Sequence, residues 1–164
     1  MYPASTTKIM TAILTLENAN LNDVVTVPYD AIRTIPAGYS IAALQTDEQL
    51  TVNQLLQVMM VYSANDAANV LAFHISGSLE NFANLMNQKV SELGLTDTHF
   101  TNPSGIHDPE HYSSAPGTSD LPVRIQESSA ASACFPTRLH FQDFWDPGSD
   151  CLAYYPFLSS FMLC

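Results

Sequence analysis

The strongest constraint on the fold of this chain is that helical periodicity is confined to residues before about position 115. Three amphipathic patterns with helical spacing occur there, and each predicts a helix. Their apolar positions are Ile9, Ala12, Ile13 and Leu16; Leu55, Val58, Met59 and Tyr62; and Leu79, Phe82, Ala83, Met86, Val90 and Leu93. From Pro116 onward no helical or strand period is sustained. The sequence therefore predicts a mainly helical region followed by a tail of a different kind.

Local signals place the ends of these helices. Ser5 stands at the N-cap or in the first turn of the first helix, and Thr51 with Gln54 has the form of a capping box before the second. We expect the second helix to end near Ser63 and the third to be closed by Gly94 as a C-cap glycine. Residues 24–44, which Pro and Gly interrupt, predict loops and edge strands.

Length and charge exclude several classes of protein. The 164 residues suit one domain, and a net charge of −11 argues against a nucleic-acid partner. No apolar run approaches the roughly 20 residues of a membrane-spanning helix, and we expect no export signal at the N-terminus. The three cysteines, Cys134, Cys151 and Cys164, form neither a zinc-binding spacing nor a complete disulfide framework.

Two short motifs supply residue types that acyl-transfer chemistry needs. Ser5 and Lys8 are three residues apart at a predicted helix start, so the lysine amine can reach the serine hydroxyl and act as its base. Ser63 and Asn65 occupy the break between two predicted helical segments. On spacing alone, an N-cap serine followed by a solvated lysine is the more frequent explanation of the first motif. A helix-to-helix turn explains the second motif equally well.

Taken together, the two motifs resemble those of the serine D-alanyl-D-alanine carboxypeptidases, the low-molecular-mass penicillin-binding proteins. The likeness covers roughly residues 2–115. It rests on Tyr2-Pro3-Ala4-Ser5-Thr6-Thr7-Lys8, on Ser63-Ala64-Asn65-Asp66-Ala67-Ala68, and on the segments Gly94–Asp108 and His111–Ala115. The resemblance implies an α+β fold of the β-lactamase/transpeptidase-like type, of which this chain is a fragment that retains mainly the helical part.

The same resemblance implies a reaction and a role for each matching residue. Ser5 attacks the peptide bond between the two terminal D-alanines of a peptidoglycan stem peptide, forms an acyl-enzyme and releases the last D-alanine. Lys8 is the general base, Ser63 relays protons to the leaving group, and Asn65 binds the substrate amide and helps to fix Lys8. The implied inhibitors are β-lactam antibiotics, no cofactor or metal is implied, and the implied location is outside the cytoplasmic membrane.

The sequence also departs from the family pattern. Its two lysines are Lys8 and Lys89, and neither begins the Lys-Thr-Gly motif that lines the cleft in this family. We expect a partial catalytic domain over residues 1–115, with little or no activity, and an unrelated, disordered tail over 116–164. We attribute the tail to a reading-frame shift or to a gene fragment near codon 115.

Two other interpretations stay open at this point. The chain could be a β-lactamase-like hydrolase, which shares the fold and the first two motifs, or a catalytically inactive helical fragment. The segment from His107 to His111 contains residue types that bind metals, but Pro109 interrupts the helical spacing that a metal site would use, and we predict no metal there. We expect the lone histidines His74 and His99 to be packed or hydrogen-bonded.

Overall fold

The first predicted helix is present and begins directly after a short turn. In the computed structural model, which describes residues 1–114 and 117, a 3₁₀ turn at Ala4–Thr6 leads into α1 (Thr7–Asn18). The described residues lie in one of two compact units of the chain, Met1–Cys134. The predictions for the three cysteines and for the tail concern residues outside this described part of the chain, apart from Gly117. They stay predictions.

A two-stranded antiparallel sheet leads into the second predicted helix. Strand β1 (Val24–Thr26) pairs with β2 (Gln49–Thr51), with Val25 opposite Leu50. Helix α3 (Val52–Tyr62) starts at once, and Thr51 and Gln54 form the predicted capping box. The left-handed conformation of Ser63, with φ of 54°, ends α3 at the expected position.

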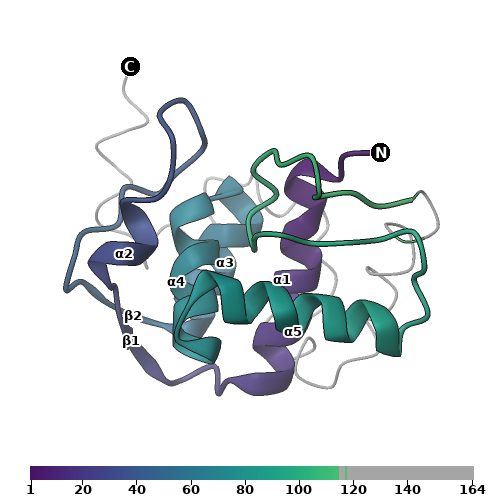
Figure 1. The fold of residues 1–164 in the computed structure, drawn as a ribbon. Helices are drawn as coiled ribbons and strands as arrows, with labels where there is room; N and C mark the ends of the chain where they lie inside the picture. The colour runs from purple at the N-terminus through teal and green to yellow at the C-terminus, as the bar shows by residue number, and fades with distance from the viewer. Residues whose placement is uncertain (115–116, 118–164) are drawn as a thin grey trace, which may run out of the picture. The chain divides into compact units, whose positions relative to one another are not determined.

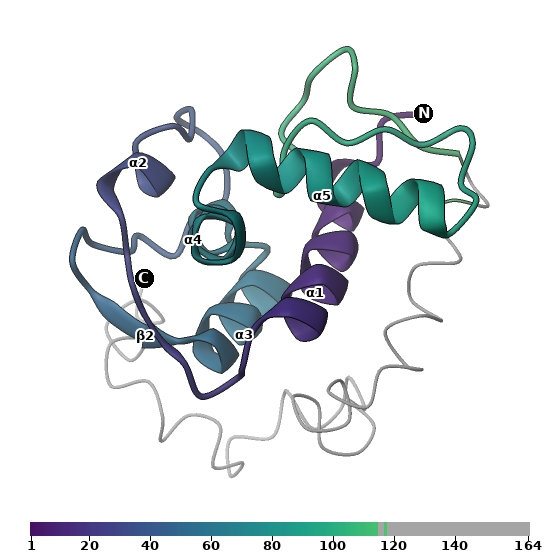
Figure 2. The ribbon, with the colours of Figure 1, turned by 60° about the horizontal axis from the view of Figure 1, so that its bottom comes forward.

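The remaining helices pack around α4 (Asn65–Ser76), whose neighbours are α1, α2, α3 and α5 (Leu79–Glu92). Figure 2 shows α4 end-on with these helices around it. Ser78 caps α5, and Gly94, with φ of 69°, follows its C-terminal end as predicted. One hydrophobic core cluster lies between α1, α4, α5 and the segment after α5, and consists of Met10, Ile13, Leu14, Ala72, Phe82, Met86, Val90 and Phe100.

One short helix lies where loops and extended pieces were expected, so that expectation is wrong at this place. Helix α2 (Tyr29–Ile32) follows Pro28, whose extended backbone starts the turn, and Asp30 lies in its first turn. The Asn69 side chain of α4 donates a hydrogen bond to the Ala31 carbonyl. Four residues are too few to show a helical period, and the contact that holds them comes from another element.

The segment after α5 crosses the N-terminal end of α1 as an irregular loop (Figure 1). It folds back on itself through an antiparallel bridge between His99 and Tyr112. Its end meets the start of the chain, because Met1 and Ser113 each donate a backbone hydrogen bond to the other, both at 2.9 Å. Among the described residues, no helix combines the length and hydropathy required to span a membrane.

Candidate active site

The structure brings Ser5 and Ser63 into contact. Ser5 is exposed on the 3₁₀ turn, and its Oγ accepts a hydrogen bond from Ser63 Oγ at 2.9 Å across 58 residues of sequence. Both hydroxyls are presented by strained backbone: Ala4, just before Ser5, has φ of 48°, and Ser63 itself is left-handed. Two unusual backbone positions therefore direct the two hydroxyls toward each other.

Lys8 lies in the first turn of α1 and is buried, with 3% of its surface exposed. Its Nζ donates to Asn65 Oδ1 and to the Ser104 carbonyl, each at 2.7 Å. Burial lowers the pKa of Lys8 from 10.5 to about 8, because both acceptors are neutral and do not repay the desolvation of an ammonium group. The amine is therefore close to half-deprotonated slightly above neutral pH.

The hydrogen-bond geometry at Lys8 suits a base. A neutral amine keeps two N–H bonds, one for each of its two acceptors, and leaves a lone pair for a third direction. Because Ser63 donates to Ser5, the hydrogen of the Ser5 hydroxyl is free to be donated elsewhere. The unshared lone pair of Lys8 and the undonated hydrogen of Ser5 are the two groups that a proton transfer would need, but Lys8 makes its hydrogen bonds to Asn65 and Ser104 and not to either Ser5 or Ser63.

The loop between α2 and β2, which contains Ser40, holds Asn65 in place. The Asn65 side chain donates to the Ser40 carbonyl at 3.0 Å, and its backbone N–H donates to the same oxygen at 2.9 Å. The buried Asp66 carboxylate accepts backbone N–H bonds from Ala42 and Leu44 and so fixes the loop that carries Ser40. The Asn65 amide is thus oriented with its oxygen toward Lys8.

A second loop forms the other wall of the Lys8 environment. Asn102 Oδ1 accepts the backbone N–H groups of Ser104, Gly105 and Ile106, which fixes the turn that presents the Ser104 carbonyl to Lys8. Gly105, with φ of 81°, packs directly on Ala4, and a Cβ added at Gly105 would stand 1.9 Å from the Ala4 carbonyl oxygen. The Ser5 turn and this loop are therefore in close backbone contact.

The structure brings the four predicted site residues together as two pairs, Ser5 with Ser63 and Lys8 with Asn65, and their catalytic roles stay predictions. Sequence reasoning missed the residues that support these pairs. Ser104 contributes a backbone carbonyl, which has no side-chain signal. The Asn-Pro-Ser-Gly run at residues 102–105 is a turn signal from which a fixed loop could have been inferred. Asp66 and Gly105 belong to the segments that resemble the family, but the sequence analysis gave neither residue a role.

The histidines of the 107–111 segment do not converge. His107 is exposed and stacks edge-on against Tyr2, whereas His111 is buried and hydrogen-bonded to Thr7. No group of three His, Cys, Asp or Glu side chains able to hold a metal ion occurs within the described residues. His74 is exposed on α4, and His99 Nδ1 makes a hydrogen bond to the Glu110 carbonyl.

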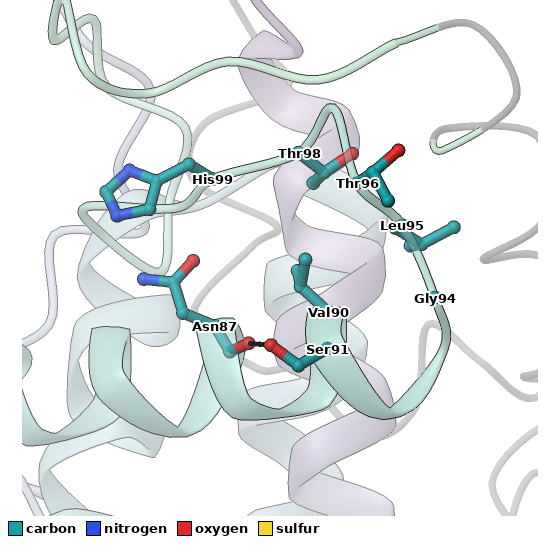
Figure 3. Close-up of a pocket in the computed structure, with 8 residues that line it drawn as sticks. All are labelled: Asn87, Val90, Ser91, Gly94, Leu95, Thr96, Thr98 and His99. Atoms are coloured by element: carbon teal, nitrogen blue, oxygen red, sulfur yellow. Dashed lines mark hydrogen bonds between the residues drawn. The ribbon is translucent and has the colours of Figure 1, made fainter.

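A pocket of about 280 Å³ lies apart from these residues, between α5 and the segment that follows it. Figure 3 shows Asn87 and Val90 of α5 below the side chains of Thr98 and His99. None of the four predicted site residues lines it. The Asn87 side chain is already engaged with the backbone of Phe100 through both its oxygen and its nitrogen.

Comparison with known proteins identifies the family of the chain. The chain matches the D-alanyl-D-alanine carboxypeptidase family over residues 1–132. It is 40% identical over 119 residues to D-alanyl-D-alanine carboxypeptidase DacF of Bacillus subtilis, a match that covers 70% of this chain and 30% of that protein. The boundary near residue 115 stays a prediction.

Solved structures of the same type share the fold. Penicillin-binding protein 6B of Escherichia coli superposes with a TM-score of 0.74 at 32% identity, over 77% of this chain and 43% of that chain. Penicillin-binding protein 5 of Haemophilus influenzae superposes with a TM-score of 0.70 at 38% identity, over 77% of this chain and 38% of that chain.

The described residues therefore have the fold of the penicillin-binding, transpeptidase-like proteins, and the predicted fold class is confirmed. Within that class, the chain belongs to the D-alanyl-D-alanine carboxypeptidase family. It spans about a third of the length of the curated relative it matches.

Proposed function

We propose that this chain carries the acylation half of a serine-type D-alanyl-D-alanine carboxypeptidase site. The observation that carries the proposal is the contact of Lys8, a buried lysine of lowered pKa, with Asn65. Lys8 lies three residues along the chain from Ser5, whose hydroxyl is hydrogen-bonded to Ser63. Family membership supports the reaction class, and the hydrogen-bond geometry supports the assignment of roles.

In the proposed mechanism, Ser5 is the nucleophile and Lys8 its general base. Neutral Lys8 takes the Ser5 proton as Oγ attacks the carbonyl carbon between the two D-alanines, which gives a tetrahedral intermediate. The C–N bond then breaks, and Ser63 passes a proton to the leaving amine and recovers one from Lys8. Water hydrolyses the resulting ester on Ser5. Asn65 hydrogen-bonds the substrate amide and keeps Lys8 in place, and the Ser5 backbone N–H contributes to the oxyanion hole.

We infer the substrate class from the membership of the chain in the D-alanyl-D-alanine carboxypeptidase family. We infer a peptidoglycan stem peptide that ends in D-Ala-D-Ala, β-lactam antibiotics as acylating inhibitors, and a site of action outside the cytoplasmic membrane. We also infer weak turnover for the 164-residue chain, since it contains no Lys-Thr-Gly run. The family resemblance implies that this run supplies the second oxyanion donor, and loss of one such donor slows an acyl transfer by about 10²- to 10³-fold.

Intact-mass spectrometry after incubation with benzylpenicillin tests the proposal. We expect a mass increase of one benzylpenicillin molecule on the wild-type chain and none on Ser5→Ala. Ser91→Ala is the matched control, because Ser91 is an exposed serine on α5 whose hydroxyl donates to the Asn87 carbonyl of the same helix. Circular dichroism on the same samples shows whether each variant is folded.

The outcomes separate the competing functions. An adduct that persists in Ser5→Ala, or no adduct on a folded wild-type chain, contradicts the acylation proposal. Consumption of benzylpenicillin without an accumulating adduct indicates a β-lactamase-like hydrolase. If the wild-type chain shows no cooperative thermal transition, the result supports the interpretation as an inactive helical fragment.

A further inference from the structure

His111 is a buried histidine to which the proposed mechanism gives no role. It is 2% exposed, and both of its ring nitrogens are engaged. The Thr101 backbone N–H donates to Nδ1 at 3.0 Å, so Nδ1 carries no hydrogen. A neutral ring then has its hydrogen on Nε2, which donates to Thr7 Oγ1 at 2.8 Å. Its two neighbours therefore determine the tautomer of His111.

These two bonds join the parts of the chain that surround Lys8. Thr7 is the buried first residue of α1 and stands between Ser5 and Lys8 in the sequence. Thr101 leads into the turn that presents the Ser104 carbonyl to Lys8. His111 therefore connects the helix that carries the lysine to the loop that supplies one of its two acceptors.

Neighbouring contacts make this connection rigid. The Phe100 ring packs edge-on against the His111 ring, with centroids 5.4 Å apart. One helical turn beyond Thr7, Thr11 Oγ1 donates to the Pro103 carbonyl at 2.6 Å, so the same face of α1 is tied to the loop twice. A ring held on its edge and at both nitrogens has little freedom to reorient.

We propose that His111 is a positioning residue that acts through Thr7: its Nε2–H···Oγ1 bond keeps the start of α1 against the 101–106 loop, and so keeps Lys8 on the Ser104 carbonyl. The inference rests on the proposed function, in which Lys8 is the base. When the Thr7–His111 bond is lost, the Thr11–Pro103 bond still ties the loop to α1, but the loop loosens at the start of the helix, water reaches Nζ, and the ammonium form is stabilised. The expected consequence is a lysine that is a poorer base at neutral pH.

Two pairs of variants separate this role from simple packing. In His111→Gln the amide nitrogen can take the place of Nε2 and donate to Thr7, whereas in His111→Asn the shorter amide reaches only the position of Nδ1. Thr7→Ser keeps the hydroxyl and loses a methyl group, whereas Thr7→Val keeps the shape and loses the hydroxyl. In each pair one variant retains the bond between residues 7 and 111.

The first readout is the pKa of Lys8, measured by NMR on the full chain with labelled lysine. The sequence contains two lysines, so two signals are expected. Lys89, whose pKa is raised by its bond to Glu17, serves as the internal reference. We expect the Lys8 pKa to stay near 8 in His111→Gln and Thr7→Ser, and to move up toward 10.5 in His111→Asn and Thr7→Val.

The second readout is acylation by benzylpenicillin, resolved into reversible binding and the acylation rate. The two variants that lose the bond should acylate about tenfold more slowly with binding unchanged, and their effects should not add in the double variant. Thermal melts of all variants exclude unfolding. If His111→Asn fails to fold, the Thr7 pair decides the question.

The inference is overturned if the Lys8 pKa is the same in Thr7→Val as in the wild type, or if both His111 variants shift it equally. Its failure is distinguishable from failure of the proposed function. A wild-type chain without a Ser5-dependent adduct contradicts the function alone, because the NMR titration reports on Lys8 without requiring any turnover.

Discussion

At the scale of single residues, the site depends on a lysine that is buried without a carboxylate to balance its charge. Lys8 donates to one amide oxygen and one backbone carbonyl, and burial alone lowers its pKa to about 8. The folded chain therefore binds fewer protons than the unfolded chain between about pH 8 and 10.5. Stability should rise with pH across this window, because the folded state no longer holds a buried ammonium.

The first prediction concerns the pH dependence of acylation. The rate should rise with pH as Lys8 loses its proton, by about tenfold per unit below pH 8, and should level off above it. Lys8→Arg, which stays protonated, should lose about 10²- to 10⁴-fold in rate. Stopped-flow or quenched mass measurements from pH 6 to 10 check this, and a flat profile contradicts the assignment of Lys8 as the base.

The second prediction concerns acid stability. Burial, reinforced by His99 and His107 and opposed by Asp108, lowers the pKa of His111 from 6.5 to about 4. As pH falls from 6.5 to 4, the unfolded chain takes up a proton that the folded chain does not. The free energy of unfolding should therefore fall by on the order of 3 kcal/mol over that range, with no further loss from this group below it.

Urea unfolding of the wild type and of His111→Gln across this pH range measures that effect. Glutamine does not titrate, so the variant should lack this part of the pH dependence. Equal slopes for the two proteins would show that another group is responsible.

At the scale of elements, the contact between the 3₁₀ turn at Ala4–Thr6 and the 102–106 turn determines where Ser5 lies. Both turns use left-handed backbone at their meeting point, at Ala4 and at Gly105. Gly105 is needed there for two reasons, its positive φ and the lack of room for a Cβ against Ala4.

The third prediction compares two glycines. Gly94 also has a positive φ, but open space surrounds the position of its missing Cβ. Gly94→Ala should cost about 1 kcal/mol of stability from backbone strain alone, and should leave acylation unchanged. Gly105→Ala should cost about 1–3 kcal/mol more, because the clash displaces the Ala4 carbonyl, and should slow acylation.

Denaturant unfolding and the benzylpenicillin mass assay on both variants check this comparison. Equal stability losses would mean that the 102–106 turn moves aside without cost. Unchanged acylation in Gly105→Ala would mean that the Ser5 turn is fixed by other contacts.

Elements with their own local pattern were predictable, and elements held by distant residues were not. The apolar spacing of α1, α3 and α5 predicts these helices, and the Thr51–Gln54 box and Gly94 predict their ends. Helix α2 was missed because Asn69, far along the chain, holds its four residues in place. The Ser104 carbonyl was missed for the same reason, since its role depends on a tertiary contact and not on residue type.

At the scale of the whole molecule, one buried cluster joins α1, α4, α5 and the segment after α5. Phe82 and Phe100 are its largest fully buried side chains, and every buried polar side-chain atom among the described residues has a hydrogen-bond partner. A core that includes both helices and loop is expected to unfold as one unit.

The fourth prediction is a single cooperative thermal transition for the chain, with Phe82→Ala losing about 3–5 kcal/mol of stability. Circular dichroism at 222 nm together with calorimetry measures it, and coincident transitions by the two methods are the expected result. A gradual loss of helix signal with no heat peak would favour the inactive helical fragment over a folded carboxypeptidase domain.

The sequence was enough to identify Ser5 as a candidate nucleophile, but its position relative to the other site residues could be obtained only from the structure. The paired motifs and their family resemblance singled out Ser5, Lys8, Ser63 and Asn65 from the sequence. Their mutual distances depend on how the helices pack around α4 and on the two loops that support them. Local periodicity contains no information on either.

The hydrogen bonds that assemble the site also bear on the order in which the chain folds. Those of Lys8 join residues 57 and 96 positions apart, and the Thr7–His111 bond closes a separation of 104. Closing long loops costs chain entropy before the contact gives any stability in return. The helices should therefore form and dock first, and the proposed nucleophile, its proposed base and their supporting loops should come together on the native side of the folding barrier.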